Sequence, residues 1–370
     1  MILLYLILPL LALLFYAAGL TDKSKEKFYF WLFAIFLIII AGLREPGTDK
    51  DSLNYFDLVE NADRLPIYFR NFLAYVYWEP FYYFPASVIR TYSLPTALFF
   101  IFYACMSVGV KFYAIQRMTP FPFLSSFVLV CHFFYLQDMT QIRTAVAVGF
   151  MLCAILALVN RNYISFILLI CIGGLFHYSL LILFFLAFLD THTLNRYIYF
   201  GLLVIPYLLI FAGFNIVDLL SLANLGVFTE KLQIYNDLVQ AGVWNYINLF
   251  SVELIIQISL CSLFILKWDV LQARNRFSVI LIKAYVISVF LLVIFSPIPT
   301  FSFRFGGLLE GVHIILIPFL LYIIKPKALS YLIIFSVSSV LFYIAIFYAK
   351  FVEPYSLFTE GISFHAISGP

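Results

Sequence analysis

The chain has 370 residues, of which 64% are hydrophobic and only 11% are charged. A soluble domain of this length carries roughly a quarter charged residues, so the composition excludes a soluble globular protein. It predicts an all-α, polytopic integral membrane protein built as one transmembrane domain over residues 1–370. The net charge of +3 is too small to indicate a nucleic-acid partner. The five cysteines lie in apolar runs without metal-binding spacing, which is typical of buried apolar side chains.

A membrane-spanning helix needs about 20 mostly apolar residues. The first apolar run has no basic region before it and no cleavage site after it, so it predicts a first spanning helix rather than a signal peptide. The run from Ile164 to Leu189 is too long for one helix, and Gly173, Gly174 and His177 divide it. With that division, about twelve crossings are expected, at 2–20, 28–43, 96–115, 121–137, 143–159, 163–177, 178–190, 197–214, 247–266, 277–296, 306–324 and 329–349.

The distribution of lysine and arginine predicts the orientation of these helices. Short basic connections, such as 21–27, 267–276 and 325–328, are expected on the cytoplasmic side. Both termini and most of the acidic residues then lie outside. An unbroken helix over 163–190 would place two of these basic connections outside, which argues for the division at His177.

Two long outer segments, 44–95 and 215–246, are expected to contribute to an outer-face cavity covered by periplasmic loops. Residues 66–93 are rich in aromatic side chains, which favours an interfacial or re-entrant segment at the level of the lipid headgroups. Residues 226–241 alternate polar and apolar side chains with a helical period. This pattern predicts a short amphipathic helix over the mouth of the cavity.

Three arginines, Arg44, Arg143 and Arg304, stand at the expected outer ends of helices. Each could extend to the lipid headgroups, which is the ordinary behaviour of such residues. If they converge instead, they form a cationic clamp for a phosphate-bearing lipid, because the planar guanidinium binds two oxygens at once. Gln141, beside Arg143 in the expected outer turn 138–142, adds further hydrogen-bonding groups.

Several acids and one histidine lie near these arginines in the sequence. Pro46-Gly47 forces a turn, and beyond it Asp49 and Asp51 lie two residues apart, where they could bind a divalent metal or act as a base. The alternative for this pair is a solvated acidic loop. His177 lies at a helix break and could act as a base near neutral pH, or it could be structural.

Within the expected eleventh helix, Glu310 lies three residues before His313, so both share one helix face. Acids inside a membrane are costly, and they usually line a cavity or pair with a cation. A salt link between such an acid and an arginine above it is the structural alternative.

Several short motifs, in this order, resemble the EpsG family of Wzy-like polymerases. They cover most of the chain from residue 42 to residue 307, and each is short, but their order makes the set fairly specific. They are Gly42–Arg44, Gly47–Asp49, Asn54–Tyr55, Glu79–Tyr83, Gln141–Ala147, Phe176–Ser179 and Arg304–Gly306.

The resemblance implies a glycosyltransferase with a GT-C-like membrane fold in the bacterial inner membrane. Such enzymes polymerise oligosaccharide repeat units carried on undecaprenyl diphosphate into O-antigen, capsule or exopolysaccharide at the periplasmic face. The growing chain moves from its lipid carrier to the sugar end of a new unit. The implied partners are the lipid-linked donor and acceptor glycans, membrane lipid and a chain-length regulator, and no nucleic acid.

The chemistry of this reaction assigns roles as hypotheses. A general base takes the proton of the acceptor hydroxyl, with Asp49 and His177 as first candidates and Asp138 and Glu79 behind them. Arg44, Arg143 and Arg304, with Gln141 and Glu310 nearby, would bind the substrate and offset the charge on the departing diphosphate. No cofactor is expected; a divalent metal is not required, although Asp49 and Asp51 leave one open. Stacking on sugars or hydrogen bonding to them is assigned to Tyr55, Tyr82 and Tyr178.

Three other functions remain open on the sequence. An O-antigen ligase uses the same donor with a different acceptor. A GT-C enzyme that uses a lipid monophosphate sugar would need a metal held by acids. A glycolipid transporter or flippase is disfavoured because the polar residues gather on one expected face and the helix centres carry no continuous charged path.

Overall fold

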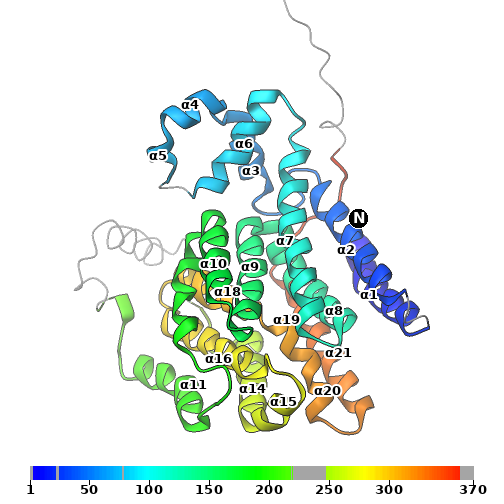
Figure 1. Ribbon diagram of the computed structural model, residues 1–370, viewed down its shortest axis with the longest axis vertical. Coiled ribbons are helices and arrows are strands. Elements are labelled where there is room, and N and C mark those ends of the chain that lie inside the picture. The colour runs from blue at the N-terminus through cyan, green and yellow to red at the C-terminus, as the bar shows by residue number, and fades with distance from the viewer. Residues whose placement is uncertain (1–2, 22–24, 77–78, 218, 220–246, 359–370) are drawn as a thin grey trace, which may run out of the picture. The chain divides into compact units, whose positions relative to one another are not determined.

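The computed structural model describes residues 3–21, 25–76, 79–217, 219 and 247–358. All regular elements in these ranges are helices, and the described residues contain two isolated β-bridges but no strand (Figure 1). The chain divides into two compact units, Met1–Phe184 with Pro326–Pro370, and Phe185–Lys325. Each unit is described by itself below.

The first unit is organised around α7, which packs against α2 on one side and α9 on another, while α9 also packs against α10. Four short helices, α3 to α6, lie between α2 and α7 in the chain, and α6 contacts both α7 and α10. Their bounds are α1 (Leu3–Thr21), α2 (Glu26–Gly42), α3 (Ser52–Asn61), α4 (Leu65–Arg70), α5 (Phe72–Val76), α6 (Pro80–Tyr92), α7 (Ala97–Met118), α8 (Pro122–Phe133), the π-helix η1 (Phe134–Thr140), α9 (Ile142–Val159), α10 (Tyr163–Phe176), α21 (Lys327–Tyr343) and the π-helix η5 (Ile344–Tyr348).

The second unit is built on α16, which contacts α11, α14 and the segment from η3 to α18. The 3₁₀ helix η2 (Tyr178–Phe188) enters it from the first unit. The bounds of its elements are α11 (Arg196–Phe211), α14 (Val252–Leu266), α15 (Trp268–Arg274), α16 (Ser278–Ile294), α17 (Pro299–Phe301), the π-helix η3 (Ser302–Gly306), α18 (Gly307–Glu310), α19 (His313–Leu316), the 3₁₀ helix η4 (Ile317–Phe319) and α20 (Leu320–Ile323).

Each of the twelve predicted apolar runs overlaps a helical segment, which confirms a helical protein with several helices suited to a membrane. Only some of these segments are long enough to cross one. Among the described residues, five helices have the required length and composition, or six if α14 and α15, bent by 73° at Lys267, form one span. The five are Ala97–Met118, Pro122–Thr140, Ile142–Val159, Pro299–Ile323 and Lys327–Tyr348.

The expected count of twelve crossings is therefore not confirmed. Several of the remaining apolar helices have only 10–17 residues, against the roughly 20 that a straight span needs. A hydropathy pattern locates such a helix but does not show whether it crosses, because two short helices and one broken span have the same apolar content.

The predicted division at His177 is confirmed. Helix α10 ends at Phe176, His177 is extended with φ −154° and ψ 110°, and η2 begins at Tyr178. Gly173 allows the chain to pack closely here, since a Cβ atom at this residue would lie 2.7 Å from Cβ of Phe150 in α9. His177 is thereby held at a helix end beside α9.

The predicted turn at 138–142 is confirmed in position, but it is shorter than expected. The π-helix η1 continues α8 through Thr140, and only Gln141 separates it from α9. The Gln141 backbone N–H donates to the Leu136 carbonyl, at 2.9 Å, so the change of direction takes one residue. The charge of Asp138 suggested a turn residue, but Asp138 lies inside the first unit, where it forms an ion pair with Lys111.

Candidate active site

Glu79 is the residue that brings three separate elements of the first unit together. It directly precedes Pro80, the first residue of α6, where a proline ring suits the helix start. Its backbone has φ 68° and ψ 114°, in a region that residues other than glycine rarely adopt. Such a conformation costs about 1–3 kcal/mol and occurs most often at functional sites, where the surrounding structure holds it in place.

Both carboxylate oxygens of Glu79 have partners from distant parts of the chain. Oε2 forms an ion pair with Nη1 of Arg143, in the first turn of α9. Oε1 lies 3.0 Å from Nδ1 of His177 and accepts a hydrogen bond from the Tyr178 backbone N–H at 3.4 Å. The carboxylate therefore joins the start of α9 to the break between α10 and η2.

Aromatic rings surround the Arg143 guanidinium. Its Cζ atom lies 4.1 Å from the centroid of the Tyr82 ring, a cation–π contact. The ring of Tyr55, in α3, lies 6.1 Å from that of Tyr82, and the positive charge of Arg143 acts on its hydroxyl. Tyr55, Tyr82, Tyr178, Arg143, Glu79 and His177, which the sequence singled out separately, thus form one cluster.

The electrostatics of the cluster favour a charged carboxylate. Burial alone would raise the pKa of Glu79, but the His177 hydrogen bond and the positive charge of Arg143 outweigh it and hold this pKa below its usual value. Burial raises the pKa of the Tyr82 hydroxyl, despite the nearby Arg143 charge, so this hydroxyl stays protonated.

The three polar side chains differ in their access to a ligand. Arg143 is 26% exposed, Glu79 13% and His177 7%. An incoming anion would therefore meet the guanidinium first. A carboxylate at Nδ1 of His177 favours the tautomer that carries its proton on Nδ1, which makes Nε2 the basic nitrogen. The cluster can bind an anion and accept a proton.

Arg44 and Asp49 form a separate, fully buried pair in the first unit, with Nε 2.7 Å from Oδ2 and neither side chain exposed. The other Arg44 nitrogens donate to the carbonyls of Ala41 and Met139, and its Cζ atom lies 4.6 Å from the Phe100 ring centroid. The alternative that Arg44 extends to lipid headgroups is therefore wrong, because its side chain is enclosed by protein.

Asp49 uses its second oxygen to hold the following turn. Its Oδ1 accepts hydrogen bonds from the backbone N–H groups of Asp51, at 3.1 Å, and Ser52, at 3.0 Å. The turn itself follows the sequence prediction, with Gly47 at φ 94°. Because hydrogen-bond donors occupy both Asp49 oxygens, this geometry offers little to a divalent metal.

Asp138 also has a buried cationic partner, which the sequence analysis did not identify. Nζ of Lys111, in the middle of α7, lies 2.9 Å from both carboxylate oxygens of Asp138, and both side chains are fully buried. A lysine inside an apolar helix is itself the missed signal, since a buried charge requires a partner. Gln141 is half-buried between η1 and α9, next to this pair in the chain.

The C-terminal segment of the first unit pairs with the loop that carries Arg44 and Asp49. Isolated β-bridges join Arg44 to Leu357 and Asp49 to Val352. The backbone N–H of Glu353 donates to the Thr48 carbonyl at 2.7 Å, and that of Glu45 to the Ser356 carbonyl at 3.0 Å. Sequence reasoning gave this segment no role, because no local pattern reveals so distant a pairing.

The remaining site candidates lie in the second unit or outside the described residues. Arg304 is half-buried in η3, a π-helix, and such segments are frequent at functional sites. Glu310 is buried, and its Oε1 accepts a hydrogen bond from Nε2 of Gln257 at 2.6 Å. Nδ1 of His313 lies 3.7 Å from the same oxygen, so the predicted shared face is confirmed. The amphipathic helix predicted at 226–241 lies outside the described residues.

Comparison with known proteins gives one family and one curated relative. The sequence model of the EpsG family matches residues 27–358. The chain is 25% identical over 346 residues to the amylovoran biosynthesis protein AmsC of Erwinia amylovora, covering 91% of each chain. No solved structure matches the chain.

Proposed function

The chain belongs to the EpsG family, and from this premise we propose that it is a membrane glycosyltransferase that polymerises repeat units of a polysaccharide. The relative AmsC is named an amylovoran biosynthesis protein, which supports a role in the same kind of pathway. The proposed donor and acceptor are oligosaccharides on undecaprenyl diphosphate. The proposed site faces the periplasm from the bacterial inner membrane.

The observation that carries this proposal is the cluster of Glu79, Arg143 and His177. The acceptor hydroxyl oxygen attacks the anomeric carbon of the donor, and the bond from that carbon to the diphosphate oxygen breaks. The hydroxyl proton passes to Nε2 of His177, and the lipid diphosphate leaves with the bonding electron pair. Arg143 offsets the negative charge that builds on the diphosphate.

Glu79 holds the other two residues in position for this step. Its Oε1 orients the His177 ring through Nδ1, at 3.0 Å, and stabilises the imidazolium that forms. Its Oε2 fixes Arg143 against the Tyr82 ring. The ion pair also limits the cost of keeping Arg143 half-buried before the substrate binds.

The buried pairs take supporting roles in this proposal. Arg44 with Asp49 and Lys111 with Asp138 hold the loop and the π-helix that precede the cluster, rather than contacting substrate. Arg304 and Glu310 remain proposed substrate-binding residues of the second unit. No metal takes part in the proposed reaction, and a chain-length regulator is a proposed partner.

The test is the length of the polymer made in cells that lack the chromosomal gene. Arg143→Ala, Glu79→Gln and His177→Gln should each reduce polymerisation by about 100-fold or more, as expected for loss of one charge-stabilising or proton-accepting group. The glycan would collapse from a ladder to single repeat units on a gel. Arg90→Ala, an exposed arginine in the last turn of α6, is the matched control and should keep the full ladder.

A full ladder from both Arg143→Ala and His177→Gln, at normal protein levels, would rule out this site. Purified protein separates the competing functions. Transfer of the glycan to a lipid A core instead of a second repeat unit would identify a ligase. Loss of activity on chelation would identify a metal-dependent enzyme, and movement of glycolipid across vesicles without bond formation would identify a transporter.

A further inference from the structure

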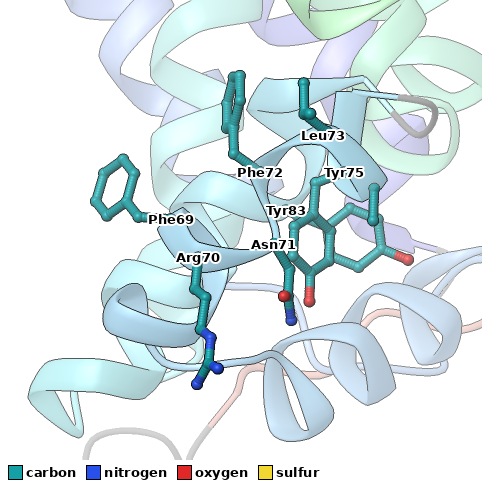
Figure 2. A pocket seen from close by; sticks show the side chains of 8 residues that line it. Phe69, Arg70, Asn71, Phe72, Leu73, Tyr75 and Tyr83 are labelled. Atoms are coloured by element: carbon teal, nitrogen blue, oxygen red, sulfur yellow. The ribbon is translucent and has the colours of Figure 1, made fainter.

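The short helices before the proposed site enclose an open pocket of about 390 Å³. Its volume lies within the range of about 300–1,000 Å³ that small-molecule sites occupy. Figure 2 shows the side chains that line it. They come from α4, α5 and α6 and their connections, and they are Phe69, Arg70, Asn71, Phe72, Leu73, Ala74, Tyr75 and Tyr83.

Two tyrosine rings, Tyr75 and Tyr83, form one wall of this pocket. The centroids of Tyr75 and Tyr83 are 5.1 Å apart, and Tyr75 also stacks on the buried Tyr68 at 4.9 Å. The Tyr75 hydroxyl donates to the Asp63 carboxylate, and this bond raises the pKa of Tyr75 to about 12. The ring of Tyr75 is therefore fixed before any ligand arrives.

The polar and apolar side chains of the pocket point in different directions. In Figure 2 the polar ends of Arg70 and Asn71 point downward, with one tyrosine hydroxyl beside Asn71, while Phe72 and Leu73 point upward. Arg70 is exposed, and no described carboxylate pairs with it. The polar side thus offers ring faces together with guanidinium, amide and hydroxyl groups.

The pocket connects to the proposed site through neighbouring rings. The Tyr83 centroid lies 5.2 Å from that of Tyr82, and the Tyr82 ring carries Arg143 at 4.1 Å. A ligand on Tyr83 would lie a few ångströms from the ring that holds the guanidinium. The pocket and the proposed site therefore adjoin each other along α6.

We infer that this pocket binds sugar units of the glycan, which deepens the proposed function and rests on it. A sugar ring has an apolar face of C–H groups, which packs on aromatic rings, and an edge of hydroxyls, which hydrogen-bond to arginine and asparagine side chains. A lipid tail has no hydroxyl groups, so it could not form hydrogen bonds with Arg70 and Asn71. The polar side of the pocket therefore favours a saccharide over the bilayer.

The test measures binding without the reaction. The full-length protein in detergent is titrated with free oligosaccharides of one to three repeat units, prepared by partial hydrolysis of the host polysaccharide, and binding is followed by saturation-transfer NMR. Tyr83→Ala and Tyr75→Ala should weaken binding about tenfold, the loss of one aromatic contact. Tyr83→Phe should keep most of it, and Tyr92→Ala, an exposed tyrosine at the end of α6, should bind like the wild type.

Failure of the pocket and failure of the proposed function give different results. Arg143→Ala should still bind the oligosaccharides while making no polymer, and binding by a wild-type protein that never polymerises would refute only the function. No binding to the wild type, or equal binding to Tyr75→Ala and Tyr83→Ala, would overturn the pocket. In a chain whose five native cysteines are replaced by alanine, quenching of a fluorophore on Asn71→Cys by lipid-phase nitroxides would also overturn it, because the polar side would then face the bilayer.

Discussion

Glu79 shows how one residue can be constrained by its backbone and its side chain together. Its carboxylate lies between α9 and the end of α10, where three contacts hold it: Arg143, His177 and the Tyr178 N–H. Strain of about 1–3 kcal/mol persists only where surrounding contacts offset it. The contacts of the Glu79 carboxylate offset the strain of its backbone conformation.

The depressed pKa of Glu79 predicts how this pairing depends on pH. A carboxyl group whose pKa is lower in the folded state stabilises the fold above its unfolded pKa, about 4.3, and loses that contribution as the pH falls through the folded value. The thermal unfolding midpoint of the wild type should therefore exceed that of Glu79→Gln most clearly at neutral pH. The two midpoints should converge in acid, once the pH has fallen below the depressed pKa of Glu79. A gap that widens in acid would contradict this account.

Lys111 and Asp138 predict a second result at the residue scale. Removing one partner of a buried ion pair leaves an uncompensated charge, at a cost on the order of 3–5 kcal/mol. Lys111→Met alone should therefore lower the unfolding midpoint strongly, while Lys111→Met with Asp138→Leu should recover most of the loss.

The double variant also tests a candidate base. Asp138 was one of four carboxylates and histidines that the sequence put forward for that role. If the double variant folds and still gives a polymer ladder, Asp138 is not the base. If it folds with wild-type stability but makes no polymer, the supporting role proposed for this pair is wrong.

At the scale of elements, the π-helix η1 leads directly into α9, and the C-terminal segment holds the loop that follows α2. Helix η1 carries Asp138 and ends two residues before α9, which carries Arg143 in its first turn. The start of the loop after α2 is held by the close packing of Gly42 on α7. A Cβ atom at Gly42 would lie only 2.9 Å from the Cα of Ile101. From the other side it is held by the C-terminal segment.

The role of that segment predicts the effect of two truncations. Deleting residues 351–370 removes the three backbone hydrogen bonds that join this segment to the loop after α2, donated by Glu45, Glu353 and Phe358 and each worth about 1 kcal/mol. The unfolding midpoint and the polymer length should both fall. Deleting only residues 359–370 keeps all three bonds and serves as the matched control. Equal midpoints for the two truncated chains would show that the segment does not hold the loop.

At the scale of the whole molecule, the apolar pattern predicted where helices form but not which of them cross a membrane. The runs at 143–159 and 329–349 became long helices. The run at 163–190 became α10 and η2, each shorter than a straight span. Helix formation depends on local composition, which the sequence displays. Whether a helix crosses the membrane depends on how short helices stack end to end, and the sequence does not display that arrangement.

The sequence by itself determined the helical membrane class, the break at His177, the turn at Gly47 and membership of a polysaccharide-related family. It also named every member of the cluster around Glu79. Only the tertiary structure decided how these residues pair. Arg44 and Arg143 look alike in sequence, since both are arginines at helix ends. In the structure Arg44 is fully buried in an ion pair with Asp49, whereas Arg143 is partly exposed and pairs with Glu79. Partners such as Glu79 and His177 lie 98 residues apart, and helix packing alone brings them within hydrogen-bonding distance.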